Sequence, residues 1–488
     1  MESTGSTGNT ESTGNSESTY DVVVIGGGST GENVADHAHR GGLSVAMVES
    51  HLVGGECSYY ACMPSKALLR PAQALEAARR VAGAAGAVGE VDATAVLERR
   101  TSFTHGWDDS SQVRWADGAG IDVVRGRGRL DGERRVVVAG PDGERVLTAR
   151  HAVVVATGSA PAVPPVDGLA SARFWTTREA TSATAVPRRL VVIGAGVAGT
   201  ELAQAFARLG STVTLLARSR VLSALPAGAG HAVAEALLRD GIDVRTGAAV
   251  ASVDRAAGPD GEVTVRLEGG GEVVADEVLV AAGRRPRTGD LGLATIGLEL
   301  DDGAPLEVDD SGRVGAVAGG WLYAAGDVTG RAPLTHQGKY AARAVGVAVA
   351  ARAAGTLGDD VEPWSAAAAT ADHRAVPQVV FTDPGVAHVG LDADAAREAG
   401  FTVRMVEEDL GAVAGASLHA DGYAGWARLV VDAERDVVLG ATFVGQDVAE
   451  LLHAATIAVV GEVPLSRLRH AVPAYPTMSE IWLRLLDH

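Results

Sequence analysis

The chain has 488 residues, of which 47% are hydrophobic and 4% aromatic, with 62 glycines and a formal net charge of −19. This length suggests about two to four domains, because a single hydrophobic core stops growing at about 250–300 residues. The negative charge argues against nucleic acid and anionic membrane as main partners, since both reward clustered Lys and Arg.

Residues 1–19, MESTGSTGNTESTGNSEST, are polar and of low complexity, and we expect them to form a disordered tail. The tail lacks the basic and apolar regions of a secretory signal. No run of about 18 apolar residues occurs in the sequence, so no membrane span is expected. Two cysteines cannot staple a secreted scaffold of this size, and we therefore expect a cytoplasmic protein.

Residues 21–49, DVVVIGGGSTGENVADHAHRGGLSVAMVE, combine an apolar run, a glycine loop, a helical stretch and a second apolar run. This order predicts a βαβ unit. In such a loop the first glycine makes the turn, the second lets the backbone approach a pyrophosphate, and the third lets helix and strand pack. Glu49 ends the second strand, where a carboxylate accepts hydrogen bonds from ribose hydroxyls. The unit therefore predicts an FAD site with Gly26, Gly28, Gly31 and Glu49.

Both cysteines, Cys57 and Cys62, lie within GGECSYYACMPSK at residues 54–66. Five residues of regular helix rise about 7.5 Å, which exceeds the Cα–Cα span of a disulfide, about 4.4–6.8 Å. A bridge between them therefore requires an irregular turn, and strain of that kind makes a disulfide easier to reduce. Pro64 and Ser65 are predicted to begin a helix whose positive end favours a thiolate.

Two other interpretations of the cysteine pair are weaker. A zinc site needs two further thiolate or imidazole ligands, and the sequence has no other Cys and no His pair with ligand spacing. A purely structural disulfide is unusual in a cytosolic chain. No metal site is predicted.

Residues 190–218, LVVIGAGVAGTELAQAFARLGSTVTLLAR, repeat the βαβ pattern. Two copies, each after a strand and before a helix, make a chance match improbable. The second strand of this copy is followed by Arg218 and Arg220, with no acid. Guanidinium groups pair with a ribose 2′-phosphate, which a carboxylate would repel, so this unit predicts NADPH rather than NADH. Solvated surface arginines are the alternative. The glycines of this copy are Gly194, Gly196 and Gly199.

Three later segments support a protein that binds two nucleotides. Strands ending in small-residue turns are predicted at 151–161 and 278–288, and WLYAAGDVTG at 321–330 is a strand before a helix. Asp327 supplies a carboxylate in the last of these segments. This carboxylate either holds hydroxyls of the flavin ribityl or diphosphate, or it caps the helix that follows. After about residue 362 the pattern changes to strands followed by helices, which predicts an α+β domain. The cofactor-binding residues predicted in these turns are Thr157, Gly158, Gly283, Gly326 and Asp327.

These motifs together resemble the class I pyridine nucleotide–disulfide oxidoreductases, the group of glutathione reductase, dihydrolipoamide dehydrogenase and mercuric reductase. The resemblance rests on CSYYACMPSK, the doubled glycine loops, YAAGDVTG, VVFTDPGVAHVG and YPTMSE, and runs from about residue 20 to the C-terminus. It implies an α/β homodimer with two Rossmann-like nucleotide-binding domains, for FAD and NADPH, and a C-terminal α+β dimerisation domain. The implied boundaries are 20–165 with 288–360 for FAD, 166–287 for NAD(P)H and 361–488 for dimerisation.

The resemblance also implies roles for individual residues. Hydride passes from NADPH to the flavin, which then reduces the Cys57–Cys62 bridge. Cys62 is the flavin-proximal, charge-transfer thiol, and Cys57 is the interchange thiol that attacks the substrate. Lys66 matches the family lysine near flavin N5, with Glu201 as its carboxylate partner. A buried ammonium there must be paired, or it would deprotonate.

The C-terminal motif departs from the disulfide reductases. Tyr475 occupies the place of their histidine base, with Glu480 retained, and both are expected from the second subunit. A tyrosine, with a pKa of about 10 against about 6.5 for histidine, is a poor base but can protonate a departing thiolate. His470 is the nearby alternative base. Mercuric reductases share this tyrosine, but their second, C-terminal cysteine pair is missing here, which disfavours mercury reduction.

Three further positions bear on the site. Tyr59 and Tyr60 either narrow the disulfide pocket, stack on an aromatic substrate or simply pack. Val197 stands where glutathione reductases have a tyrosine over the flavin, so nicotinamide access is expected to be less gated.

The leading hypothesis is an FAD enzyme that uses NADPH to reduce a small-molecule disulfide, or a similar thiol-accessible acceptor, through Cys57 and Cys62. The alternative is an NADPH:acceptor reductase that acts on quinones, dyes or metal ions mainly from the flavin. A third hypothesis, of a different class, is a flavin-containing interaction partner that uses its acidic tail.

Overall fold

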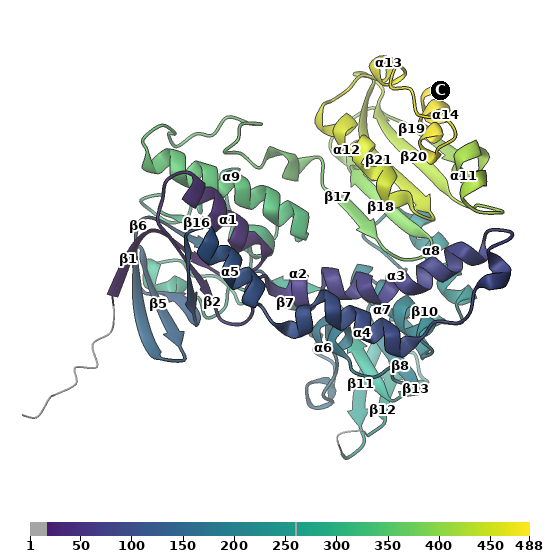
Figure 1. Ribbon diagram of the computed structural model, residues 1–488, viewed down its shortest axis with the longest axis horizontal. Coiled ribbons are helices and arrows are strands. Elements are labelled where there is room, and N and C mark those ends of the chain that lie inside the picture. Colours follow the sequence, from purple (N-terminus) through teal and green to yellow (C-terminus); the bar gives the residue numbers. More distant parts are fainter. Residues whose placement is uncertain (1–16, 259–260) are drawn as a thin grey trace, which may run out of the picture.

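The computed structural model describes residues 17–258 and 261–488 (Figure 1). Of the predicted tail, residues 1–16 lie outside the described residues, while residues 17–19 already belong to strand β1. Figure 1 shows one sheet on the left, a second below on the right and a third above it. This arrangement of α/β and α+β units confirms the predicted fold class. The domain boundaries given above stay a prediction.

The first sheet has seven strands within the described residues, in the order β3-β2-β1-β6-β5-β4, with β16 also paired to β6. Strands β1, β2, β3, β6 and β16 are joined in parallel, whereas β4 and β5 are antiparallel. The bounds are β1 (Glu17–Ile25), β2 (Val45–Glu49), β3 (Ile121–Arg125), β4 (Arg127–Leu130), β5 (Arg135–Gly140), β6 (Gly143–Val155) and β16 (Leu322–Ala324).

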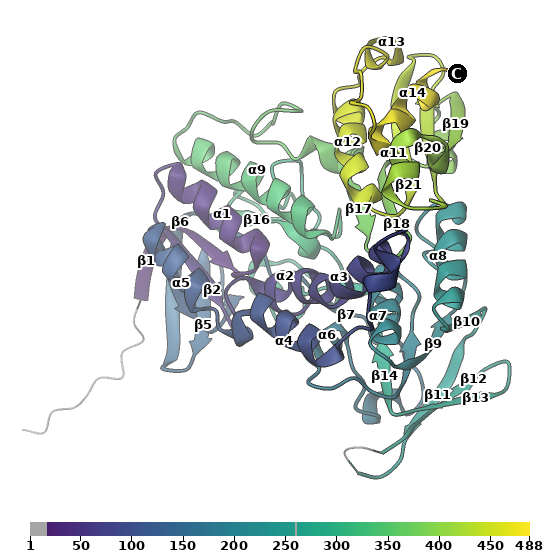
Figure 2. The ribbon, with the colours of Figure 1, turned by 45° about the vertical axis from the view of Figure 1, so that its right-hand side comes forward.

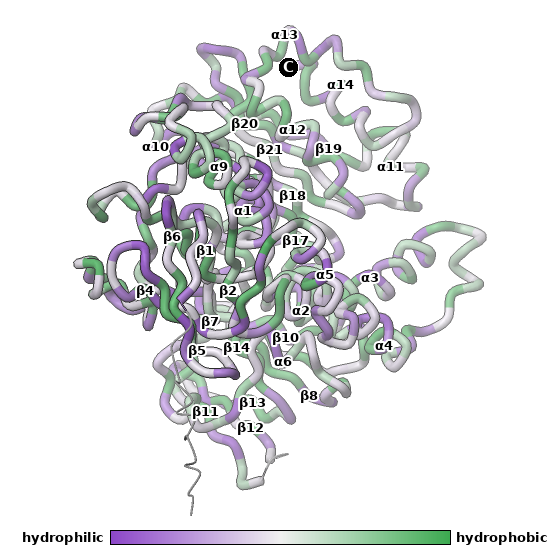
Figure 3. The backbone as a smooth tube through the Cα atoms, turned by 60° about the vertical axis from the view of Figure 1, so that its left-hand side comes forward, coloured by the Kyte–Doolittle hydropathy of each residue, from purple (hydrophilic) through white to green (hydrophobic). Residues whose placement is uncertain are grey.

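Valine-rich runs form the centre of this sheet because both of its faces are covered. Val22 and Val24 pack on one face, with helices α1 (Ser29–Arg40) and α9 (Thr335–Ala353), and Val23 and Ile25 pack on the other. Successive strand residues point to opposite faces, so a continuous apolar run fills both. The hydrophobic stretches along β1, β2 and β6 are visible in Figure 3.

The second sheet is fully parallel, in the order β10-β9-β8-β14, and lies beside an antiparallel sheet, β11-β12-β13. A two-stranded ribbon, β7 (Ser159–Pro161) with β15 (Arg284–Pro286), connects this region to the first sheet. The strands are β8 (Arg189–Ile193), β9 (Thr212–Ala217), β10 (Asp243–Thr246), β11 (Val250–Arg255), β12 (Val263–Leu267), β13 (Glu272–Ala275) and β14 (Glu277–Val280), and the helices are α6 (Thr177–Ser182), α7 (Val197–Arg208) and α8 (Ala227–Arg239).

The C-terminal part is an antiparallel sheet in the order β17-β18-β21-β20-β19, covered by helices. Its strands are β17 (Pro377–Val380), β18 (Gly385–Gly390), β19 (Val403–Asp409), β20 (Trp426–Asp432) and β21 (Val437–Gly445). Its helices are α10 (Ala393–Glu398), α11 (Ala414–His419), α12 (Leu452–Val460), α13 (Leu465–Leu468) and α14 (Ile481–Leu486).

Helix α3 (Cys62–Arg79) lies where the three parts meet. It packs against α7 and α4 (Ala93–Phe103), and it follows α2 (Gly55–Tyr59) directly in the chain. In Figures 1 and 2 it extends from the first sheet to a position below β17 and β18. Helix α5 (Ser110–Gly118) packs on β3. Among the described residues, no helix is long and apolar enough to cross a membrane.

Candidate active site

The two cysteines lie on either side of a break between two helices. Helix α2 carries Cys57 and ends at Tyr59, and α3 begins at Cys62. Between them Ala61 adopts φ −130° and ψ −96°, which is not helical. The irregular turn predicted from the spacing is therefore present, and Cys62 occupies the first, electropositive turn of α3.

The two thiols are unbridged and partly buried, and each affects the pKa of the other. The hydrogen bond from Cys57 lowers the pKa of Cys62 to about 6, against the opposing effect of burial, with help from Thr335 and the charge of Lys66. The Cys62 Sγ lies 3.2 Å from the Thr335 Oγ1. The hydrogen bond to Cys62 and burial raise the pKa of Cys57, so Cys62 carries the thiolate.

Lys66 and Glu201 meet across the contact between α3 and α7. The Lys66 Nζ donates to the Glu201 Oε2 at 2.7 Å, and Glu201 is only 2% exposed. The Phe381 backbone N–H donates to the other carboxylate oxygen at 2.9 Å. The pairing implied by the resemblance is therefore present in the structure, one helical turn after Cys62.

The first glycine loop joins β1 to α1 and has the shape of a phosphate cradle. Gly26 has φ +108°, and a β-carbon at Gly31 would collide with the Gly26 carbonyl oxygen. A β-carbon at Gly28 would have its nearest neighbour 3.7 Å away, and no side chain caps the α1 N-terminus there. The open second glycine and the uncapped helix fit a pyrophosphate. Glu49 ends β2 and accepts from the Gly27 N–H at 2.8 Å.

The second loop, between β8 and α7, repeats this geometry. Gly194 has φ +109°, and a β-carbon at Gly199 would collide with the Gly194 carbonyl oxygen. Nothing lies within 4 Å of a β-carbon at Gly196, and α7 also begins without a side-chain cap. This loop therefore fits a second dinucleotide.

The two arginines after β9 have different surroundings. Arg218 is exposed and lines the cleft beside the second loop. The guanidinium of Arg220 instead donates to backbone carbonyls of the following loop, at distances of 2.6–3.0 Å. Three of its five N–H donors are thus engaged within the chain, which the sequence did not indicate, although Arg220 is also exposed and lines the cleft. The accepting residues are Leu222, Ser223 and Leu225.

The small-residue turns lie at the ribbon and at the end of β16. The Thr157 Oγ1 donates to the Arg287 carbonyl at 2.8 Å, and the Arg287 N–H donates to the Gly158 carbonyl at 3.0 Å. Gly283 accepts from Ala162 at 2.9 Å. After β16, Gly326 and Asp327 begin the short helix η5 (Gly326–Thr329), and the Asp327 Oδ2 accepts from the Ser159 hydroxyl at 2.6 Å.

A single cleft of about 2330 Å³ joins these features. It is lined by both glycine loops, both cysteines, Glu49, Asp327 and Val197. The chain's two lysines, Lys66 and Lys339, also line it. Among the described residues, no group of three or more His, Cys, Asp or Glu side chains is arranged to hold a metal ion.

Several residues of the cleft were not predicted from the sequence. Glu56, which precedes Cys57, forms ion pairs with Arg284 and Arg287. Arg284 in turn donates to the Ser159 hydroxyl, so polar contacts run from the cysteine segment to Asp327. The rarity of lysine was the one sequence signal that could have marked Lys339. Thr335 and Phe381 carry no comparable signal.

The remaining predicted residues are not gathered at the cysteines. Tyr475 is 78% exposed, and Glu480 accepts from the Thr477 and Gly415 N–H groups at 3.2 and 3.1 Å. Neither these two nor the exposed His470 line the cleft within the described part of their own chain. The two tyrosines between the cysteines are anchored by packing: Tyr59 is buried, and Arg178 lies 4.1 Å above the Tyr60 ring.

Comparison with known proteins shows the family to which the chain belongs. The family model of the pyridine nucleotide-disulphide oxidoreductases matches residues 20–355, and the dimerisation-domain model of the same family matches residues 376–485. The chain belongs to this family. It is thus a homodimeric flavoprotein disulfide oxidoreductase that uses FAD and a pyridine nucleotide.

The individual relatives are named as enzymes with different activities. The chain is 31% identical to a mercuric reductase of Lysinibacillus sphaericus, covering 94% of this chain and 81% of that one. It is 33% identical to a dihydrolipoyl dehydrogenase of Thermus scotoductus, covering 95% of each. Among solved structures, LpdA of Mycobacterium tuberculosis matches with a TM-score of 0.79 and 25% identity, covering 97% of this chain and 99% of that one. The HOCl-induced flavoprotein disulfide reductase RclA of Escherichia coli shares the fold, with a TM-score of 0.81 at 24% identity over 96% and 99% of the two chains.

Proposed function

We propose that this protein transfers electrons from NADPH to a small-molecule disulfide through Cys57 and Cys62. The observation that carries the proposal is the asymmetry of the two thiols, which both line the cleft: Cys62 begins helix α3, lies 3.2 Å from the Thr335 Oγ1 and has a lowered pKa, whereas Cys57 lies in α2 and has a raised pKa. That asymmetry fits one sulfur that stays at the flavin and a second that meets the substrate.

The residues that would hold FAD are Gly26, Gly28, Gly31, Glu49, Thr157, Gly158, Gly283, Gly326 and Asp327. The open cradle at Gly28 supports this assignment, because it is the place where a β-carbon would exclude a pyrophosphate. When bound, the flavin accepts a hydride from the nicotinamide and supplies two electrons to the sulfur pair. The Lys66 ammonium, held by Glu201, keeps a positive charge at the thiolate side of that pair.

The second cradle, at Gly194, Gly196 and Gly199, would hold the pyridine nucleotide. We propose NADPH rather than NADH because Arg218 faces the cleft and no acid stands at its place in the chain. Arg220 contributes by ordering the loop behind Arg218, since three of its N–H donors bind backbone carbonyls.

The sulfur steps follow from the two positions. The Cys57 sulfur attacks one sulfur of the substrate disulfide and forms a mixed disulfide, and the first leaving thiolate takes the Cys57 proton and departs as a thiol. The Cys62 thiolate then attacks the Cys57 sulfur, which forms the Cys57–Cys62 bridge and displaces the second thiolate. The substrate gains two electrons, the cysteines lose two, and two protons complete the product thiols.

Tyr475 and Glu480 of the second subunit are proposed to complete the site. Tyr475 is 78% exposed in its own chain, as expected of a residue that reaches a partner. Its hydroxyl would donate a proton to a departing thiolate, which a histidine does in the disulfide reductases that this chain resembles. His470 is the weaker candidate for this role. A cytoplasmic location, where NADPH is supplied, fits the proposal.

The test is a Cys57→Ser variant assayed for NADPH oxidation with a panel of disulfides, quinones and Hg(II). We expect a loss of disulfide turnover of at least about a thousandfold, because the attacking sulfur is gone. NADPH should still reduce the bound flavin in this variant. Undiminished disulfide turnover would contradict the proposal.

A second candidate is reduction of quinones or metal ions directly from the flavin. Tyr475 in place of a histidine base favours it, because flavin-based transfer needs no base for the thiols. In this case Cys57→Ser keeps its activity towards quinones and Tyr475→Phe is nearly silent. The relatives include mercuric reductases, but this chain has no cysteine besides Cys57 and Cys62 to relay a soft metal ion.

A further inference from the structure

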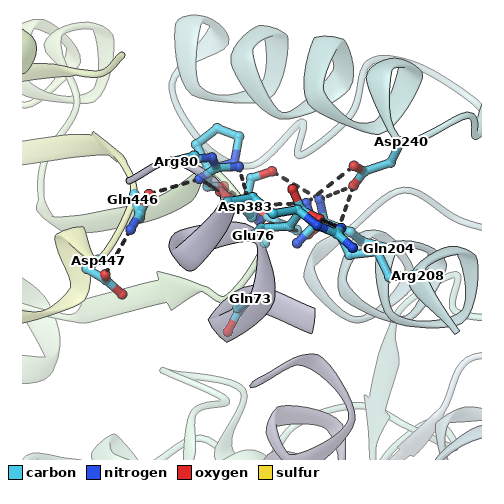
Figure 4. A network of polar contacts seen from close by, with 12 residues as sticks. Gln73, Glu76, Arg80, Gln204, Arg208, Asp240, Asp383, Gln446 and Asp447 are labelled. Carbon is cyan, nitrogen blue, oxygen red and sulfur yellow. Dashed lines mark hydrogen bonds and ion pairs between the residues drawn. The ribbon is translucent and has the colours of Figure 1, made fainter. Parts of the chain in front are cut away.

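A short segment after β17, residues 381–383, contacts both α3 and α7. Figure 4 shows its Asp383 between side chains of these two helices. On α7, three polar side chains spaced three and four residues apart share one face and reach this segment. Glu201 accepts the Phe381 N–H at 2.9 Å. Gln204 accepts the Asp383 N–H at 2.8 Å and donates to the Asp383 carbonyl at 3.0 Å. Arg208 donates to the Asp383 carboxylate at 3.1 Å.

Helix α3 and its C-cap residue, Arg80, contact the same segment through side chains spaced seven residues apart, which again share one face. The Lys66 Nζ lies 4.9 Å from the centre of the Phe381 ring. Gln73 donates to the Phe381 carbonyl at 2.8 Å. Arg80 forms two parallel hydrogen bonds to the Asp383 carboxylate, at 2.8 and 2.6 Å.

The Asp383 carboxylate is the centre of this arrangement and is 8% exposed. Burial raises its pKa, but the hydrogen bond from Arg80 and the charge of Arg208 outweigh burial and hold the pKa below its usual value. Asp240 fixes the two α7 side chains that bind Asp383: it accepts hydrogen bonds from Gln204 at 2.8 Å and from Arg208 at 3.0 Å. The carboxylate thus stays ionised and fixes the position of the segment.

The segment in turn limits the freedom of the lysine pair. One oxygen of Glu201 binds Lys66, and the other is held by the Phe381 N–H. A carboxylate bound at both oxygens cannot rotate, and the Phe381 ring attracts the ammonium from a second side. The position of Lys66 therefore depends on the position of Phe381.

We propose that Asp383, with Arg80 and Arg208, acts as a positioning residue that holds Phe381 against the Lys66–Glu201 pair and so keeps the ammonium beside Cys62. This inference rests on the proposed function, because it assigns a task to the residues behind the sulfur pair. It also makes the contact between α3, α7 and the C-terminal sheet a determinant of thiolate reactivity as well as of domain docking.

The test uses the Asp383→Asn holoenzyme, which keeps the shape of the side chain and removes its charge. NADPH-reduced enzyme is titrated with pH, and the long-wavelength thiolate–flavin absorption is recorded. We expect the midpoint to rise by about half a pH unit, less than for removal of the lysine charge, because a displaced Lys66 stabilises the Cys62 thiolate less. An unshifted midpoint in a folded, flavin-loaded variant overturns the proposal.

The matched control is Asp276→Asn, which breaks the ion pair of Asp276 with Arg189 at the edge of the second sheet. This variant should lose thermal stability without moving the midpoint, since it does not touch the cysteine site. If both variants shift the midpoint equally, the effect of Asp383→Asn comes from a general loss of stability and the proposal fails.

Gln73→Leu keeps the proposal testable if Asp383→Asn does not fold. It removes only the hydrogen bond to the Phe381 carbonyl and should shift the midpoint in the same direction by a smaller amount. An unchanged midpoint there counts against the proposal. A failure of the proposed function has a different signature, namely full disulfide turnover in Cys57→Ser or no thiolate–flavin absorption in the unaltered enzyme.

Discussion

Cys57 and Cys62 share one short segment but have opposite electrostatic surroundings. Cys62 lies at the start of α3, receives a hydrogen bond from Cys57 and faces Thr335 and Lys66. Cys57 donates that hydrogen bond and is desolvated. The reduced pair therefore carries its single negative charge on the sulfur assigned to the flavin side.

The first prediction concerns the pH dependence of that charge. Because the pKa of Cys62 is lowered to about 6, its thiolate is present above this pH and is lost as the pH falls through it. The thiolate–flavin absorption of the reduced enzyme should therefore titrate with a midpoint near pH 6. In Lys66→Met the midpoint should move upwards by about one unit, since the positive charge is removed. A midpoint near the unperturbed thiol value of about 8.5 in the unaltered enzyme would contradict the assignment.

The second prediction separates the two arginines after β9. Arg218→Ala should raise the KM for NADPH about tenfold or more and leave the KM for NADH nearly unchanged, because only the 2′-phosphate contact is lost. Arg220→Ala should instead lower the unfolding midpoint, because its three carbonyl partners lose their donor. Steady-state kinetics with both coenzymes and thermal unfolding of both variants give the comparison. Equal effects on the two coenzymes in Arg218→Ala would count against NADPH specificity.

At the scale of elements, the two βαβ units place two helix N-termini at one cleft. In each, the first and third glycines are required by the chain's own backbone, whereas a β-carbon at the second would meet no protein atom closer than 3.7 Å. At the second glycine the protein itself leaves room for a β-carbon, and the ligand proposed above is what would exclude it. This difference allows folding and binding to be tested separately within the loop between β1 and α1.

The third prediction uses this difference. Gly28→Ala should fold normally and lose FAD affinity about tenfold or more, because its β-carbon meets no protein atom closer than 3.7 Å but points to the proposed pyrophosphate site. Gly31→Ala should cost about 1–3 kcal/mol of stability, because its β-carbon collides with the Gly26 carbonyl. Flavin content after gel filtration and thermal unfolding of the apoprotein measure the two effects. A Gly28→Ala protein with full flavin content would show that the cradle does not hold the phosphates.

The sequence predicted these elements well where the determinants are local. The shape of the glycine loops, the position of Glu49 at the end of β2 and the break between the cysteines follow from residues close in the chain, and the pairing of Lys66 with Glu201 followed from the family resemblance. The ligands of these residues stay predictions. The use of Arg220 by its own loop and the contact of Glu56 with Arg284 and Arg287 depend on tertiary placement. No pattern along the chain predicts them, since the partners of Glu56 lie at the far end of the inserted region.

At the scale of the whole molecule, the C-terminal part leaves apolar side chains uncovered. Val472 is 81% exposed and Tyr475 78% exposed, in the same stretch of chain. A homodimer accounts for such exposure, because large apolar side chains at the surface mark interaction sites. The stretch that contains Val472 and is expected to bring Tyr475 to the partner would then be part of the subunit contact.

The fourth prediction tests this contact. Val472→Glu should weaken the dimer about tenfold or more, because the new charge would be buried against the partner. Analytical ultracentrifugation over a concentration series measures the change, with Val163→Glu as the control, since Val163 is also exposed but lies beside the ribbon. Disulfide turnover should fall with the dimer fraction. An unchanged dimer would place the subunit contact elsewhere.

The ribbon of β7 and β15 has a consequence for how such proteins diversify. The chain enters and leaves the inserted region through strands that are paired with each other, so the two crossing points are immediate neighbours. Because its two ends are adjacent, the inserted region can be replaced by another domain without changing the path of the chain in the rest of the protein. If the inserted region binds the coenzyme, as proposed, recombination or design can replace coenzyme preference in one step, provided that the incoming α7 keeps the carboxylate of Glu201 that binds Lys66.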